Sequence, residues 1–104
     1  MDVLDRRAVG FQERFALQEE FRSRVRARRN RAVGLWAASL RGLDAADAEA
    51  LADVLVEEDP DDDAIAKALV VEFARANVDM SQRRVRQKLV EALARAQADI
   101  ADGR

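Results

Sequence analysis

The residues that could do chemistry in this 104-residue chain are acids, arginines, two lysines and three serines, because it contains neither histidine nor cysteine. The two missing types supply the usual general base near neutral pH, the commonest metal ligands and the thiol nucleophile. The serines are Ser23, Ser39 and Ser81, and none has a plausible base beside it. We therefore expect no enzymatic activity, no disulfide and no required cofactor. The chain should work by binding something larger.

One spacing of acids is typical of a metal site. Asp59, Asp61 and Asp63 fall at positions one, three and five of a calcium-binding loop. The pattern then fails, because Ala64 stands where the loop needs glycine and Val70 where it needs the final bidentate glutamate. Acids at the start of a helix are also favourable caps. The sequence therefore predicts a turn and a helix cap here, and no metal.

Residues 22–31 hold six arginines and an asparagine, the residue types that contact phosphates and base edges in nucleic-acid complexes. Alternate residues point in different directions around a helix, so these arginines do not line one face. Residues 44–63 carry ten acids and neither lysine nor arginine. Pairing between the two segments is favoured over nucleic-acid binding, whose affinity would fall steeply with salt.

Four helices are expected to position these groups, giving an all-α, four-helix bundle-like domain with a long N-terminal helix. Threonine and tyrosine, two strand-forming types, are absent, and the larger apolar residues recur at helical spacing. Glycines, the single proline and capping residues mark the ends. The expected helices span residues 3–41, then 45–58 after the cap Asp44, then a segment up to residue 76 capped by Asp61 or Asp62, and 82–101 after Ser81 or Asp79. Their ends are expected at Gly42, Asp59-Pro60 and Asn77.

Apolar stripes on these helices predict a single core. Residues 65–74 show the cleanest amphipathic pattern in the chain. From the first helix, the residues expected in the core stripe are Phe21, Val25, Ala32, Trp36 and Leu40.

The N-terminal apolar stripe is out of line with this core. It consists of Leu4, Ala8, Phe11 and Phe15. Continued along the helix it meets only polar residues, and the apolar line resumes rotated by roughly 80°. An amphipathic segment with its own face is a candidate for docking into a groove on a partner. We therefore divide the chain into a partner-docking helical segment, residues 1–20, and a helical bundle domain, residues 21–104.

Two segments a few residues apart carry a family resemblance: Ala27-Arg28-Arg29-Asn30-Arg31 and Gly34-Leu35-Trp36-Ala37-Ala38. Together with Phe11-Gln12-Glu13-Arg14-Phe15-Ala16 and Glu57-Glu58-Asp59-Pro60, they make the chain similar to the zeta subunit of alphaproteobacterial F-type ATP synthases. This is the ATPase-inhibitor family of those bacteria. The resemblance covers nearly the whole chain.

The resemblance implies a regulatory subunit that binds the catalytic head and rotor of the synthase and inhibits ATP hydrolysis through its N-terminal helix. The residues we assign to partner binding are Leu4, Arg7, Ala8, Phe11, Arg14 and Phe15. Arg7 and Arg14 flank the apolar stripe and could pair with acids on the target. The resemblance also implies possible binding of ATP or ADP, at a site that no residue locates. A nucleotide-binding regulator without inhibitory activity is the alternative.

The same resemblance implies a cytoplasmic protein, held peripherally at the inner membrane through the synthase. No apolar stretch approaches the ~20 residues of a membrane span, and no signal-peptide run follows Met1. We therefore expect no insertion into the membrane.

Overall fold

The structure is a computed structural model that describes the backbone of residues 3–104 and the side chains from Gly10 onward. Within that range it is all-α and contains no strand. Its helices are α1 (Val3–Arg41), α2 (Ala45–Glu58), α3 (Asp62–Arg75) and α4 (Gln82–Ala101). The predicted fold class is confirmed, and the helix ends agree with the expected ones to about a residue.

Local chemistry sets the helix ends. Asp44, Asp61 and Ser81 each accept a hydrogen bond from the backbone N–H three residues on, at 2.8, 2.7 and 3.1 Å. Each such cap satisfies one N–H that the first turn leaves unpaired and is worth about 1 kcal/mol. Gly42 and Asn77 have left-handed backbone angles, with φ of 72° and 59°, which terminates the preceding helices.

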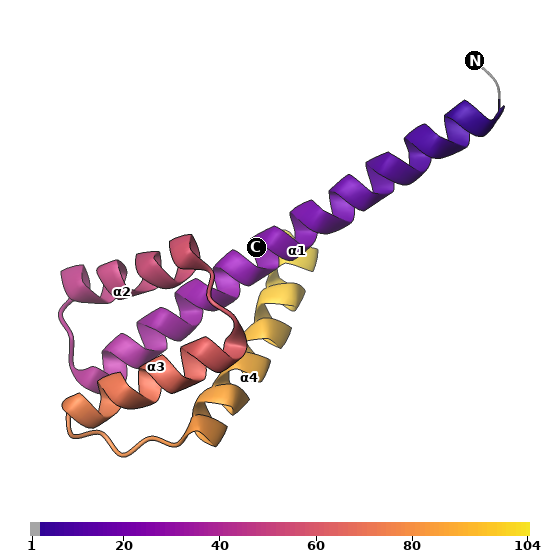
Figure 1. Ribbon diagram of the computed structural model, residues 1–104. Coiled ribbons are helices and arrows are strands. Elements are labelled where there is room, and N and C mark those ends of the chain that lie inside the picture. Colours follow the sequence, from indigo (N-terminus) through magenta and orange to yellow (C-terminus); the bar gives the residue numbers. More distant parts are fainter. Residues whose placement is uncertain (1–2) are drawn as a thin grey trace.

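The helix α1 is the axis of the molecule (Figure 1). Its C-terminal half is covered by α2 and α4, and α3 packs mainly against α4 with a smaller contact to α1. Its N-terminal half projects away from the other three helices. The molecule consequently measures 64 × 24 × 21 Å.

The core lies between α1, α3 and α4, with a contribution from α2. Phe73 is fully buried at its centre, and Trp36 packs against it edge to face, with ring centroids 5.6 Å apart and an interplanar angle of 74°. The Trp36 ring is half-buried and lies against the core cluster. Lys88 places its ammonium 5.8 Å from the centroid of the Trp36 ring, within the range of a cation–π contact.

The face of α1 that enters the core differs from the predicted one. Phe21, Ala32 and Leu40 are exposed, so three of the five residues expected in the stripe were wrong. The buried row runs instead through Val25, Arg29, Val33 and Ala37. The second member of this row is Arg29, which is not apolar. A prediction from apolar spacing alone therefore favours a neighbouring row of the helix.

Candidate functional site

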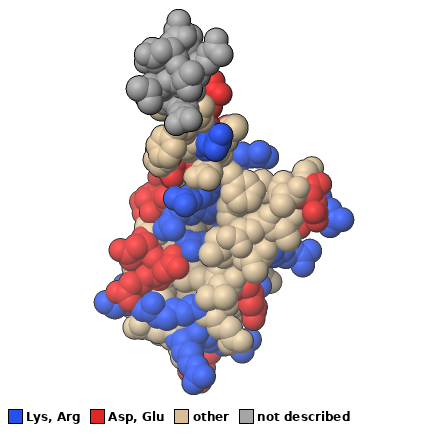
Figure 2. Space-filling model, turned by 90° about the vertical axis from the view of Figure 1, so that its right-hand side faces the viewer, with Lys and Arg blue, Asp and Glu red and all other residues tan. Residues whose placement is uncertain are grey.

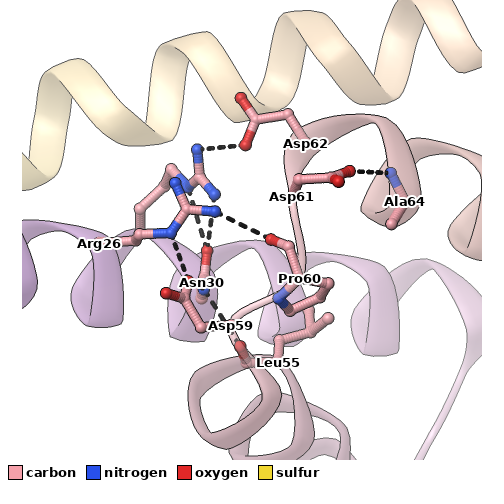
Figure 3. Close-up of polar contacts among 9 residues, drawn as sticks. Arg26, Asn30, Leu55, Asp59, Pro60, Asp61, Asp62 and Ala64 are labelled. Atoms are coloured by element: carbon pink, nitrogen blue, oxygen red, sulfur yellow. Dashed lines mark hydrogen bonds and ion pairs between the residues drawn. The ribbon is translucent and has the colours of Figure 1, made fainter.

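A polar cluster holds α1 to the turn between α2 and α3 at the point where α1 enters the bundle (Figure 3). Arg26 donates to the carboxylate of Asp59 and, at 2.9 Å, to the carbonyl oxygen of Pro60. The side-chain amide of Asn30 donates to the carbonyl oxygen of Leu55 and to Asp59 Oδ1, both at 3.1 Å. One turn of α1 therefore fixes both the end of α2 and the path of the chain towards α3.

Arg29 completes this cluster from inside the protein. Only 2% of its surface is exposed, and that of Asn30 is 0%. The Arg29 guanidinium donates to Asn30 Oδ1 at 3.1 and 2.9 Å and to Asp62 Oδ1 at 2.8 Å. A buried charge is tolerated when it is both paired and hydrogen-bonded, and here all three guanidinium nitrogens donate.

The acids at the calcium-like spacing serve this turn and the following helix. Asp59 adopts a left-handed conformation with φ of 42°, and Asp61 caps α3. Asp63 binds Lys67, at 2.9 Å, and Arg86. The predicted turn and helix cap are confirmed.

Two of these acids have lowered pKa values. The hydrogen bond from Arg26 is the main cause of the lowered pKa of Asp59, and partial burial opposes it. The hydrogen bonds from Lys67 and then Arg86 lower the pKa of Asp63. Both carboxylates therefore favour the charged form that their cationic partners bind.

Three of the six arginines of residues 22–31 pair with acids of residues 44–63, as predicted. Besides Arg26 and Arg29, Arg31 lies 2.7 Å from Glu49 in α2. Arg28 lies 3.6 Å from Asp99, so the pairing extends to α4, which we did not predict. These ion pairs account for every arginine from position 26 to position 31.

The second segment that carries the family resemblance also has a structural role. Gly34 lies against α2, and a Cβ atom at this position would come within 2.7 Å of the Cα atom of Ala52. Ala37 and Ala38 are fully buried. Small residues thus allow α1 and α2 to approach closely.

The projecting part of α1 is the candidate docking site. Every residue from 11 to 24 is exposed. Phe11, Phe15 and Leu17 have exposed fractions of 71%, 56% and 65%, whereas large apolar side chains in a monomer are usually covered. The site residues Phe11, Arg14 and Phe15 are thus placed together on this segment.

The other three predicted site residues, Leu4, Arg7 and Ala8, have side chains outside the described part of the chain. The boundary drawn at residue 20 falls within continuous helix and within the exposed stretch. The division into two parts stays a prediction.

Two exposed apolar residues were missing from the predicted site. At 100° per residue, Phe11, Phe15, Leu17 and Phe21 fall within an arc of about 160°. Leu17 and Phe21 continue the buried row of α1 outward at four-residue spacing, which is the signal that could have identified them. Phe21 was instead assigned to the core, yet 39% of it is exposed.

The charges of this segment are sorted by face. Arg14 and Arg22 lie inside the apolar arc, and the glutamates lie outside it. Arg22 also forms a pair with Glu19 at 3.1 Å along the helix, which is worth little at an exposed site. The apolar face therefore carries only basic charges, whereas the three glutamates lie outside it, together with Arg24.

Comparison with protein-family models matches residues 1–99 to the family described as ATPase inhibitor subunit zeta. Neither the curated proteins nor the solved structures gave a significant match. Among the described residues, no helix is long and apolar enough to span a membrane. The family resemblance seen in the sequence is confirmed.

Proposed function

The chain belongs to the ATPase inhibitor subunit zeta family, and we propose that it is a non-catalytic subunit that binds the catalytic head of F-type ATP synthase and inhibits ATP hydrolysis. The exposed part of α1 enters a groove between catalytic subunits and reaches the rotor. The protein is then cytoplasmic and held at the inner membrane through the synthase. Binding of ATP or ADP stays a separate prediction.

The observation that carries this proposal is the row of exposed phenylalanines on a helix that leaves the bundle. Burial of one phenylalanine side chain contributes about 2 kcal/mol. The free protein leaves Phe11 and Phe15 mostly in water and Phe21 partly so, and a partner that covers them therefore gains several kcal/mol. The helix is already formed within the described chain, which lowers the conformational entropy lost on docking.

The geometry also suits an element that enters a confined space. Residues 3–24 of α1 extend for about 33 Å at 1.5 Å per residue, as a single helix. The bundle behind it is 24 × 21 Å in cross-section, which is wider than the ~10 Å diameter of a helix. The bundle therefore limits how far α1 can enter.

The test is the rate of ATP hydrolysis by the purified synthase head of the source organism, measured against increasing concentrations of the protein. The unaltered protein should inhibit, and the double variant Phe11→Ser, Phe15→Ser should need at least about 100-fold more protein, because it loses two apolar contacts. Gln12→Ala, on the same turns but outside the apolar arc, is the matched control and should inhibit normally.

A deletion of residues 1–16 extends the test. It should abolish inhibition while the bundle stays folded, as followed by circular dichroism. Equal inhibition by the deleted and the full-length protein would show that α1 is not the inhibitory element.

A further inference from the structure

A second uncharged surface lies on the outer side of α4. Figure 2 looks at the side of the molecule that carries α4 and the projecting part of α1, and shows a broad uncharged area with charged side chains along its edges. From Val90 onward, α4 presents only uncharged residues over an arc of about 120°. This face comprises Val90, Leu93, Ala94, Gln97, Ile100 and Ala101.

The exposure of this face is unusual for a surface helix. Val90 is 69% exposed, the second most exposed of the large apolar residues described, while Leu93 and Ile100 are half-buried at its edge. The charged residues of the same turns, Glu91 and Arg95, lie outside the arc. Contiguous apolar surface with a charged border is typical of a protein interface.

This face adjoins the foot of the projecting helix. Ile100 lines a surface hollow of about 580 Å³ together with Arg24 and Arg28 of α1. Phe21 precedes these arginines by three and seven positions, so it lies on their side of α1 and directly outside the bundle. We call Phe21 and the uncharged face of α4 the shoulder.

The length and continuity of α1 decide what can cover the shoulder. Within the described chain α1 has no break between Phe11 and Val25, and these two residues are separated by about 21 Å along the axis. A partner that covers the helix from Phe11 to Phe21 therefore extends as far as the bundle, where the uncharged face of α4 begins.

The size of the shoulder argues against an interface between two copies of this chain. It has seven residues, two of them half-buried, whereas a stable protein interface uses about 20–30 residues on each side. The shoulder suits the extension of a larger interface that begins on α1. The α4 part of the shoulder carries no charge, so its counterpart should be uncharged at that contact, whereas the hollow between Ile100 and Phe21 is lined by Arg24 and Arg28.

We propose that the shoulder is a second docking surface, and that an uncharged, apolar patch at the rim of the groove that receives α1 packs on it. This inference rests on the proposed function, because both surfaces bind the same partner. The projecting helix supplies the inserted contact, and the shoulder fixes the depth and rotation of the bundle against the outside of the synthase head.

The test uses substitutions of two exposed valines by charges of either sign. Val90→Asp and Val90→Lys should each weaken binding of the full chain to the purified synthase head by at least about tenfold, because either charge would be desolvated against an uncharged surface. Val54, 45% exposed on α2, is the matched control, and Val54→Asp and Val54→Lys should bind normally. Circular dichroism and the melting temperature establish that all four variants fold.

A covalent probe gives an independent readout. Since the chain has no cysteine, Gln97→Cys and Val54→Cys can each be labelled at one site with a bulky maleimide. The label at residue 97 should prevent or weaken binding, and the label at residue 54 should not.

The outcomes separate this inference from the proposed function. Normal binding by both Val90 variants and by the chain labelled at residue 97 overturns the shoulder and leaves the proposed function standing. Failure of the unaltered chain to bind the head overturns both. A doubled mass in solution that both Val90 variants abolish assigns the shoulder to a second copy and overturns the inference.

Discussion

Gly10 and Gly34 lie in the same helix, yet the surroundings of their Cα atoms differ. Apart from its own helix backbone, Gly10 has no atom of the described side chains within 4 Å of the position that a Cβ would take, whereas at Gly34 this position lies 2.7 Å from the Cα atom of Ala52. The nearest atoms at Gly34 belong to the backbone of α2, which cannot move aside as the end of a flexible side chain could. One glycine is thus required by packing, and the other is only a weak point in a helix.

The same substitution at the two sites should therefore have opposite effects. Gly34→Ala should lower the free energy of unfolding by about 2 kcal/mol, because the added methyl group forces α1 and α2 apart. Gly10→Ala should not lower it, and should raise the helix content, since alanine favours a helix by up to about 1 kcal/mol over glycine. Urea denaturation and circular dichroism measure both effects. Equal stability of Gly34→Ala and the unaltered protein would contradict the close approach of α1 and α2.

At the scale of single residues, the sequence predicts an apolar core well and a polar interior poorly. Ile65, Leu69 and Phe73 are buried as their spacing indicates. Arg29 and Asn30 are equally buried, but their partners come from α2 and from the start of α3. Only the tertiary arrangement reveals that a polar side chain will find such partners, so local periodicity could not place these two residues in the interior.

The turn between α2 and α3 is the element whose stability should depend on pH. The pKa of Asp59 lies below its ordinary value of 3.8, mainly because Arg26 donates a hydrogen bond to it. In the unfolded chain this carboxylate takes up its proton at a higher pH than in the folded protein. The stabilisation is therefore present above about pH 4 and is lost as the pH falls through the folded-state pKa.

The variant Asp59→Asn isolates this effect, because asparagine also tolerates the left-handed conformation that position 59 adopts. The unaltered protein should be the more stable of the two at pH 6, and the difference should shrink as the pH falls below 4. Urea denaturation at a series of pH values gives the difference. In an Arg26→Gln background the pH dependence should be smaller. A difference that stays constant from pH 6 to pH 2 would show that the pair of Arg26 and Asp59 does not stabilise the turn.

Helix ends in this chain were predictable because their causes are local. Asp44, Asp61 and Ser81 cap the helices that follow them, and each signal lies within three residues of the bond it makes. The orientation of each helix about its own axis depends on distant contacts. For this reason the end of α1 at Gly42 was predicted correctly, whereas its buried face was not.

The whole molecule is more extended than a compact domain. The radius of gyration is 17.6 Å, against about 13 Å for a compact chain of this length. The excess comes from the projecting part of α1, whose residues 11–24 are all exposed. The candidate site was partly predictable, because Phe11 and Phe15 belong to an N-terminal apolar stripe that is followed by polar residues. The predicted rotation of this stripe from the core was wrong, since Phe11 and Phe15 lie five full turns before the buried residues Arg29 and Val33. The sequence left open whether the segment frays or projects as a helix, and it could not show that the exposed stretch extends to residue 24, since this depends on where α2 and α4 end beside α1.

If the two parts are separate in this way, removal of the projecting part should change the dimensions of the protein but not its stability. A chain without residues 1–16 should melt within about 2 °C of the full chain, because a change of 1 kcal/mol shifts the melting temperature by at least 4 °C in a domain of this size. Its radius of gyration, from small-angle X-ray scattering, should fall towards that of a compact chain. The core variant Phe73→Ala should behave in the opposite way, with a loss of about 3 kcal/mol or more and unchanged dimensions below its melting temperature. A deletion that lowers the melting temperature by several degrees would mean that residues 1–16 pack on the bundle, and the exposed phenylalanines would then not be free to dock.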